Sequence, residues 1–422
     1  MSTLLTKPPP PVERPTPPPP TAPVTLPRPL EKPERLTSLD AYRGFIMLAM
    51  ASSSGFDLAY VASHFPGNPV WDFIGYHTDH VPWVGCGFWD LIQPAFMFMA
   101  GCAIPYSYAS RKAKGESTGK ILFHVAIRSL ALVLLGIFLS SSSSGNQGHI
   151  LVNVLTQIGL GYFFVYLLRG RGLAVQLGAT AVILVGYWLW FALYPLPPAG
   201  FDYASVGLDD KWERMTGFFV HWEKNANAAS WFDVWLLNLL PAYHAKAFAF
   251  NPGGYQTLNF IPSMATMIFG LMAGELLRGP KSREAKLGWL VGAGVGCLIV
   301  GQILGWTVCP IVKRIWTPSF AVFSAGWVLL MLAAFYAVCD LKGWKKWSFG
   351  LTVVGMNSIA IYLMSQTLRG WIKGTFRNLV GEWWIEAWLG SLWIRTVQCV
   401  VILIVLWLAC WWMYRRKIFV RI

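Results

Sequence analysis

One long stretch of this sequence combines acidic residues and histidines with a complete absence of lysine and arginine. It lies between Arg43 and Arg111 and contains Asp57, His64, Asp72, His77, Asp79, His80 and Asp90. Histidine is the side chain best suited to take up and release a proton near neutral pH. Loops without positive charge are typical of the outer side of a membrane protein. The stretch therefore predicts both an outward face and a candidate proton-transfer group.

His80 is the strongest candidate for chemistry in this stretch. It follows Asp79 directly, precedes Trp83 and lies ten positions before Asp90. A neighbouring carboxylate raises the pKa of an imidazole and orients its ring, so we predict His80, Asp79 and Asp90 as catalytic residues. The alternative is a metal site made by His77, His80 and Asp79. We favour a general base and expect no metal, because no second group of residues with the spacing of metal ligands follows later in the sequence.

A second group of candidates is basic and lies within an apolar segment. Arg128 falls in the middle of HVAIRSLALVLLG, with Lys120 and His124 on the same helical side. A charge inside a membrane helix is costly and usually faces a partner or a water-filled cavity. This strip could therefore bind a phosphate or pyrophosphate group, and the alternative is a structural ion pair.

Composition places the chain in one class. It has 422 residues, of which 55% are hydrophobic and only 13% charged, whereas a soluble protein carries about 25% charged residues. We predict an all-α polytopic membrane protein embedded in a lipid bilayer. The net charge of +14 is explained by basic cytoplasmic loops rather than by nucleic acid. The seven cysteines form no CxxC pair, and we expect no signal peptide.

Apolar blocks about as long as a bilayer-crossing helix divide the chain. We expect a disordered proline-rich cytoplasmic tail at 1–36, a transmembrane domain at 37–414 with an extracytoplasmic loop at 195–257, and a basic tail at 415–422. Basic loops alternate with charge-poor ones, which puts both termini in the cytoplasm. VKR near residue 313 and RGWIKGTFR near 369–377 are exceptions on the outer side. About ten spans are predicted, near 42–62, 90–109, 121–140, 150–168, 173–194, 258–277, 287–305, 318–339, 347–368 and 391–413.

Five motifs in order resemble the heparan-α-glucosaminide N-acetyltransferase family, including its bacterial multi-pass members, over residues 35–413. They are RLTSLDAYRGF, His80 with xxW followed by DLxxPxFxFxxG, Arg128-Ser129 with an apolar run, KRIWTPSFAVFSAG (313–326) and GMNSIAIY (355–362). By resemblance, His80 is the catalytic histidine. The chain departs from the family at Ser54, where Asn is frequent, at Thr156-Gln157, where the family has Gln-Arg, and at NPGGYQT, where the family is acidic.

The resemblance implies a membrane acetyltransferase that moves an acetyl group from cytoplasmic acetyl-CoA to an extracytoplasmic amino sugar or glycan. His80 would act as general base or as transient acetyl acceptor. The alternatives are a membrane O-acyltransferase of another type and a multi-pass transporter. A bacterial inner membrane is the expected location, and a homodimer stays open as the assembly. We expect Arg128, Lys120, His124 and Asn357 to bind acetyl-CoA, and Ser54, Asp57, Trp83, Lys313 and Trp316 to bind the acceptor.

Overall fold

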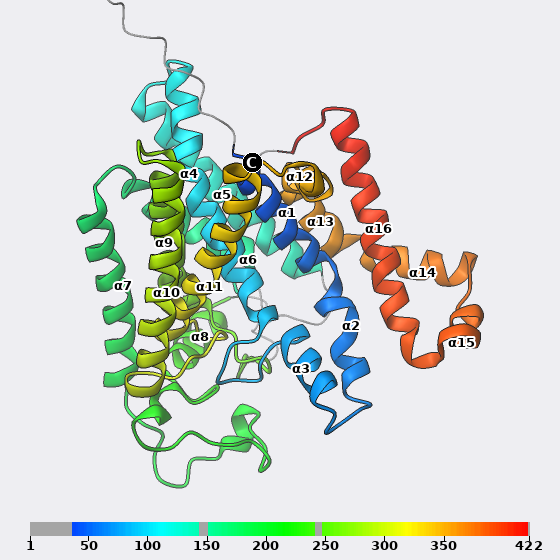
Figure 1. Ribbon diagram of the computed structural model, residues 1–422. Coiled ribbons are helices and arrows are strands. Elements are labelled where there is room, and N and C mark those ends of the chain that lie inside the picture. Colours follow the sequence, from blue (N-terminus) through cyan, green and yellow to red (C-terminus); the bar gives the residue numbers. More distant parts are fainter. Residues whose placement is uncertain (1–35, 143–150, 241–246, 421–422) are drawn as a thin grey trace, which may run out of the picture.

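The computed structural model describes residues 36–142, 151–240 and 247–420, and the proline-rich tail lies outside them. Within this part of the chain the fold is helical throughout (Figure 1), as predicted. The helices are α1 (Thr37–Ala51), α2 (Ser53–Ala62), α3 (Pro69–Thr78), α4 (Ile92–Ala113), α5 (Thr118–Ser142), α6 (Val154–Leu167), α7 (Leu173–Leu193), α8 (Ala228–Asn238), α9 (Phe260–Arg278), α10 (Arg283–Thr307), α11 (Pro318–Tyr336), α12 (Phe349–Gly355), α13 (Ser358–Thr367), α14 (Arg369–Leu379), α15 (Trp383–Leu389) and α16 (Ile394–Arg415).

The predicted count of ten membrane spans is not confirmed. Six helices of the described chain are long and apolar enough to cross a bilayer, and the bent pairs α1–α2 and α12–α13 raise this to eight. The predicted spans 90–109 and 150–168 do form helices. Polar and small residues lower the mean hydropathy of α4, and α6 has only 14 residues, which is about 21 Å of helix. Neither of these two is a candidate span by length and composition.

Glycines allow the central helices to approach closely. A Cβ on Gly101 of α4 would lie 1.9 Å from the carbonyl oxygen of Met267 in α9, and a Cβ on Gly270 would lie 1.9 Å from that of Phe98. Gly44 of α1 and Gly355 of α12 meet in the same way. Small residues at such crossings are how membrane helices pack without a hydrophobic driving force. The buried centre of the bundle is therefore formed by α1, α4, α6, α9, α11 and α12.

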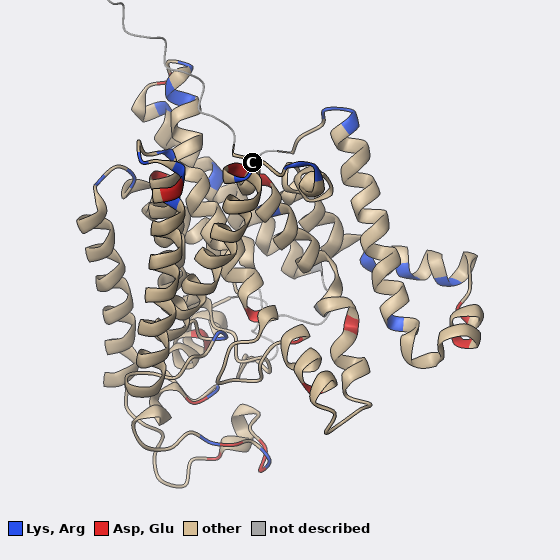
Figure 2. Ribbon diagram, viewed as in Figure 1, with Lys and Arg blue, Asp and Glu red and all other residues tan. Residues whose placement is uncertain are grey.

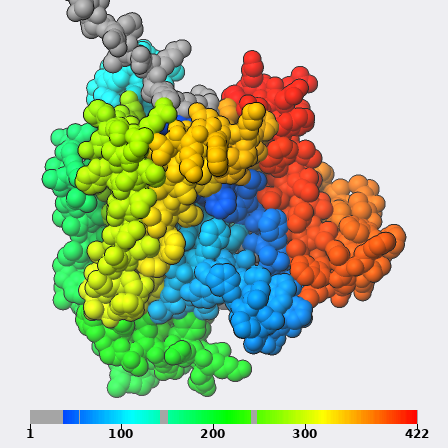
Figure 3. Space-filling model, viewed as in Figure 1, coloured from blue at the N-terminus to red at the C-terminus, as the bar shows by residue number. Residues whose placement is uncertain are grey.

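Charged residues are distributed unevenly along the bundle. Figure 2 shows most lysines and arginines near one end, beside the C-terminus. Others lie on α14, which projects sideways at about mid-height, and few lie at the opposite end, in the segment after α7. That segment, predicted as a long loop, contains α8 and a buried aromatic cluster in its described residues. Trp222 stacks on Phe191 of α7 with ring centroids 6.2 Å apart. Figure 3 shows this green segment closing the end of the molecule farthest from the C-terminus.

Candidate functional site

The core of the site is a contact among an imidazole, a carboxylate and an ammonium group. His80 Nδ1 lies 2.8 Å from Asp90 Oδ1. Lys313 Nζ lies 2.9 Å from His80 Nδ1 and 3.3 Å from His80 Nε2, and 3.5 Å from Asp90 Oδ1. The Asp90 and Lys313 side chains are 1% and 5% exposed, whereas that of His80 is 33% exposed. The ring is therefore the accessible member of an otherwise buried trio.

Local backbone structure fixes the carboxylate. Asp90 lies in a short 3-10 helix, η1 (Phe88–Leu91), just before α4. Its Oδ2 accepts hydrogen bonds from the backbone N–H groups of Gly87 at 3.1 Å and Val81 at 3.3 Å. Its Oδ1 is left to face His80. Because an ionised carboxylate only accepts, it favours the tautomer in which His80 Nδ1 carries the proton and Nε2 keeps a lone pair.

Lys313 reaches the ring because two distant loops are joined. Val84 and Val312 form an antiparallel bridge, and Gly85 N–H donates to Ile311 O at 2.8 Å. The Thr317 hydroxyl accepts from the N–H of Val312 at 3.0 Å and so closes the turn that carries Lys313. One of the two outward basic segments that disagreed with the charge bias therefore supplies a member of the site.

Burial and charge act on the ring in opposite directions. Burial and the neighbouring Lys313 ammonium lower the pKa of His80 below its ordinary value, although Asp90 opposes them. Burial alone would raise the pKa of Asp90, but the hydrogen bond from His80 and the charge of Lys313 leave it below its ordinary value. His80 is thus held neutral and Asp90 ionised near neutral pH. This is the protonation state that a base or a nucleophile requires.

His80 opens into a cavity of about 390 Å³. Two cations, Lys313 and Arg369, line this cavity, and no carboxylate of the described residues lines it, although Asp90 lies directly behind His80 and Lys313. The remaining lining residues are polar or apolar: Met50, Ser53, Trp89, Ile92, Gln93, Val152, Asn153, Val154, Tyr255, Tyr362 and Gln366. We call this the histidine cavity. Its charge favours a neutral or anionic guest over a cationic one.

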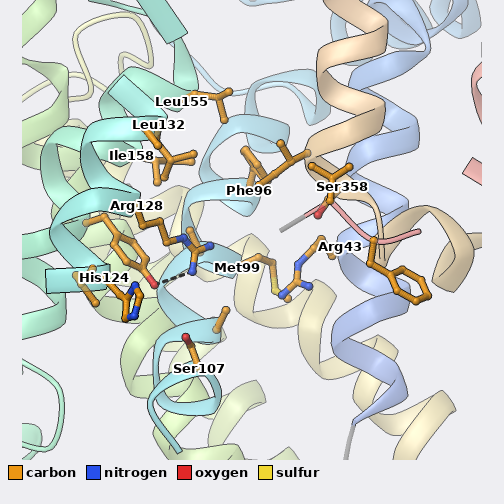
Figure 4. A pocket seen from close by; sticks show the side chains of 18 of the residues that line it. Arg43, Phe96, Met99, Ser107, His124, Arg128, Leu132, Leu155, Ile158 and Ser358 are labelled. Atoms are coloured by element: carbon orange, nitrogen blue, oxygen red, sulfur yellow. Dashed lines mark hydrogen bonds between the residues drawn. The ribbon is translucent and has the colours of Figure 1, made fainter. Parts of the chain in front are cut away.

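A larger cavity, of about 710 Å³, lies farther along some of the same helices. We call it the basic cavity, because Arg43, Arg111, Lys114 and Arg128 line it together with His124 and a single carboxylate, Asp40. Figure 4 shows Arg43 and Arg128 pointing into it from opposite sides. Arg128 Nη1 donates to the hydroxyl of Tyr162 at 3.1 Å. A cavity of this charge suits a multiply phosphorylated ligand.

The structure places the predicted basic residues unequally. Arg128 and His124 line the basic cavity, but Lys120 is exposed and does not. Asn357 is buried and binds the C-terminal segment through Ile418 O and Val420 N–H, while its neighbours Met356 and Ser358 line the cavity. The lining residues that sequence reasoning missed come from other helices. The cations among them are Arg43, in the second turn of α1, and Arg111 and Lys114, at the C-terminal end of α4, where the sequence signal was a basic helix end.

The residues predicted around the histidine are also placed unequally. Asp79 is exposed, and its Oδ1 accepts from the backbone N–H of His80 at 2.7 Å rather than meeting the ring. His77 Nδ1 accepts from the N–H of Phe88. No group of three metal-ligating side chains occurs in the part of the chain that the structure describes. That Asp79 is a catalytic residue, and that the histidine base acts without a metal, both stay predictions.

Of the predicted acceptor-binding residues whose side chains the structure describes, Lys313 alone lines the histidine cavity. Trp83 is buried and donates to Trp222 O at 3.0 Å. Trp316, buried at φ +49°, donates to Thr266 and supports the Lys313 turn. Asp57 forms an ion pair with Arg395 at 3.7 Å. The side chain of Ser54 lies outside the described part, and its neighbour Ser53 lines the cavity instead.

Fold and site together define a multi-pass helical membrane protein with a histidine–carboxylate–lysine centre. Comparison with known proteins narrows this class. No family model matches, but the chain is 26% identical over 380 residues to human heparan-alpha-glucosaminide N-acetyltransferase and 25% identical over 386 residues to the mouse protein. These alignments cover 78% and 80% of this chain. The chain is a family-level relative of these N-acetyltransferases. It spans only about half of their length, 52% and 54%.

Proposed function

We propose that this protein transfers an acetyl group from acetyl-CoA to the amine of a sugar or glycan. The observation that carries the proposal is the pairing of an accessible His80, held by Asp90 and Lys313, with two cavities of different character. The basic cavity supplies four cations for the phosphates of the donor. The histidine cavity supplies the base. The relatives that the chain resembles in sequence are named N-acetyltransferases.

In the direct route, the acceptor nitrogen attacks the thioester carbonyl carbon and His80 Nε2 takes the proton from that nitrogen. The carbon–sulfur bond then breaks, and the thiolate of coenzyme A leaves and takes up the proton. The products are an N-acetyl amide and free coenzyme A. In the second route, His80 Nε2 attacks the thioester carbonyl carbon first, the carbon–sulfur bond breaks, and the thiolate of coenzyme A leaves from an acetylated ring. The amine then displaces the ring from the acetyl group, and its proton passes to the thiolate, so the products are the same. Both routes need an unprotonated amine, which the two cations of the histidine cavity favour.

Orientation in the membrane belongs to the same proposal. The cationic end of the bundle (Figure 2) would face the cytoplasm, where acetyl-CoA is made, with both termini on that side. His80 would then lie toward the extracytoplasmic side. The acetyl group would cross most of the bilayer inside the protein, while coenzyme A remains on the cytoplasmic side.

The test is transfer from radiolabelled acetyl-CoA to glucosamine-type acceptors by the purified protein. His80→Ala should lose turnover, and His64→Ala is the matched control, since His64 is exposed and bonds only to Tyr60 O among the described contacts. Label retained on the protein without acceptor would identify the acetyl-histidine route. Equal turnover in His80→Ala and the unmodified protein would refute the assignment of the base.

A further inference from the structure

The two cavities share walls on four helices, α1, α4, α6 and α13. On α4 the histidine cavity is lined by Gln93 and the basic cavity by Phe96. On α6, Val154 lines the histidine cavity and Leu155 lines the basic cavity. On α13, Tyr362 lines the histidine cavity and Ile359 lines the basic cavity. Three residues of α-helix advance about 4.5 Å. The cavities are therefore separated by about one layer of side chains.

Two side-chain pairs form that layer. The rings of Phe96 and Tyr362 are stacked, with centroids 6.4 Å apart, and the Tyr362 hydroxyl donates to Asn153 at 3.4 Å. Beside them, Gln93 Nε2 donates to Gln157 Oε1 at 3.1 Å. We call these four residues, Gln93, Phe96, Gln157 and Tyr362, the septum.

Packing of the apolar core alone does not favour the buried pair of amide groups in the septum, Gln93 and Gln157. Gln157 is 1% exposed; it lies between the buried Thr156 and Ile158, and Ile158 and the nearby Leu155 belong to the apolar core. Burying amide groups costs free energy unless each finds a partner. Each glutamine offers both a donor and an acceptor, yet the hydrogen bond between them uses one donor and one acceptor only. The pair is thus suited to a guest that carries amide groups of its own.

We propose that the septum is the closed form of the passage for the pantetheine arm of the donor, and that Gln93 and Gln157 bind the amide groups of that arm when it enters. This inference rests on the proposed function. The arm is a narrow chain with two amides between the phosphates and the thioester. When it enters, each glutamine exchanges its partner glutamine for an amide of the arm, and the Phe96 and Tyr362 rings separate. The thioester then reaches His80 while the phosphates stay in the basic cavity.

The exchange explains why polar residues are useful at this depth. Hydrogen bonds broken between the glutamines are replaced by hydrogen bonds to the ligand, so opening does not leave buried amides unpaired. A wholly apolar septum could also part, but it would leave the arm's amides without partners. The glutamines therefore distinguish donors with a pantetheine arm from phosphorylated nucleotides without one.

The test compares two probes that share the nucleotide end, acetyl-CoA and adenosine bisphosphate. In the double variant Gln93→Leu/Gln157→Leu, both amides become apolar groups of similar size, a change that is often nearly neutral for folding. Acetyl-CoA affinity should fall by about tenfold or more, since each lost hydrogen bond is worth up to about tenfold in affinity. Adenosine bisphosphate affinity should be unchanged. Gln302→Leu in α10, which lines neither cavity, is the matched control.

The outcomes separate this inference from the proposed function. Unchanged acetyl-CoA affinity in the double variant overturns the role of the glutamines, and so does an equal loss of both probes. Gln93→Leu alone provides the same comparison if the double variant unfolds on purification. Failure of the unmodified protein to bind either probe would instead refute the proposed function itself.

Discussion

Replacing Lys313 by methionine should move the acid limb of the pH–rate profile to higher pH. Lys313 disfavours the imidazolium form of His80, so it lowers the pKa of the ring. Removing the ammonium group removes that effect and leaves Asp90, which favours the imidazolium. The pKa of His80 should therefore rise, and the variant should lose activity earlier as the pH falls.

The size of the shift follows from the distance. Two unit charges 2.9 Å apart interact by about 1.4 kcal/mol at the dielectric constant of water, and by about four times that at the effective value near a protein surface. One pKa unit corresponds to about 1.4 kcal/mol. Because the His80 side chain is 33% exposed, solvent screening favours the lower figure. We expect a shift of about one pH unit.

The assay is kcat/KM for acetyl transfer between pH 5 and 8, which reports the pKa of the free enzyme's base. The unmodified protein should show its acid limb below about 6.5, the ordinary histidine value, and Lys313→Met should show it higher. Lys313→Arg keeps the charge and should keep the limb near its original position. Lys211→Met, at an exposed lysine in the segment after α7, controls for general charge effects. An acid limb that is unmoved or displaced to lower pH in Lys313→Met would refute the reasoning.

Three further predictions follow from the same geometry. In Asp90→Asn the amide oxygen should stay with the N–H groups of Gly87 and Val81, so the NH2 group would face His80 Nδ1 and favour the tautomer with the proton on Nε2. Turnover should therefore fall by about 100-fold or more in a single-turnover assay while donor binding persists; equal rates would contradict this. Arg128→Ala should raise KM for the donor by about tenfold with little change in kcat, since one charged contact is worth about 1.5 kcal/mol; an unchanged KM would exclude phosphate binding there. Gly270→Ala should lower the thermal midpoint of unfolding, because overpacking at the α4–α9 crossing destabilises the fold by about 1–3 kcal/mol. Gly288→Ala is the control and should leave the midpoint unchanged, since there is open space around Gly288; equal midpoints in the two variants would show that the helices can separate freely.

The sequence predicted the parts of the site that depend on local structure. The ten-residue separation of His80 and Asp90 placed the carboxylate at the start of a helix and the ring in the loop before it, and the structure joins them. Helical periodicity placed His124 and Arg128 on one face, and both line the basic cavity. The same periodicity failed for Lys120, because eight residues of helix advance about 12 Å and carry it beyond the cavity.

The parts that could not be predicted depend on contacts across the fold. Lys313 lies 233 positions from His80, and nothing in its own segment shows that Nζ reaches the ring. Asp79 was predicted from adjacency, but successive residues in extended backbone point in different directions, and its carboxylate turns to the backbone N–H of His80. The count of ten spans is not confirmed, because α6 forms an apolar helix of only 14 residues and α4 is less apolar than the candidate spans.

Lys313 has two opposing effects on the proposed reaction, and their balance is the physical basis of the site. Before reaction, the trio of Asp90, His80 and Lys313 carries no net charge with the ring neutral, and adding a proton would leave an extra positive charge in a largely buried place. When the acceptor nitrogen attacks, His80 gains a proton at the moment an oxyanion forms on the thioester carbonyl. An ammonium group next to that oxyanion stabilises the pair although it destabilises the imidazolium alone. Lys313 would thus keep the base neutral in the ground state and favour the transition state, which is the differential stabilisation that accelerates a reaction. Lys313→Met should accordingly lower the plateau rate and also displace the acid limb to higher pH. If Lys313 had only a structural role, its substitution would not produce these two effects together.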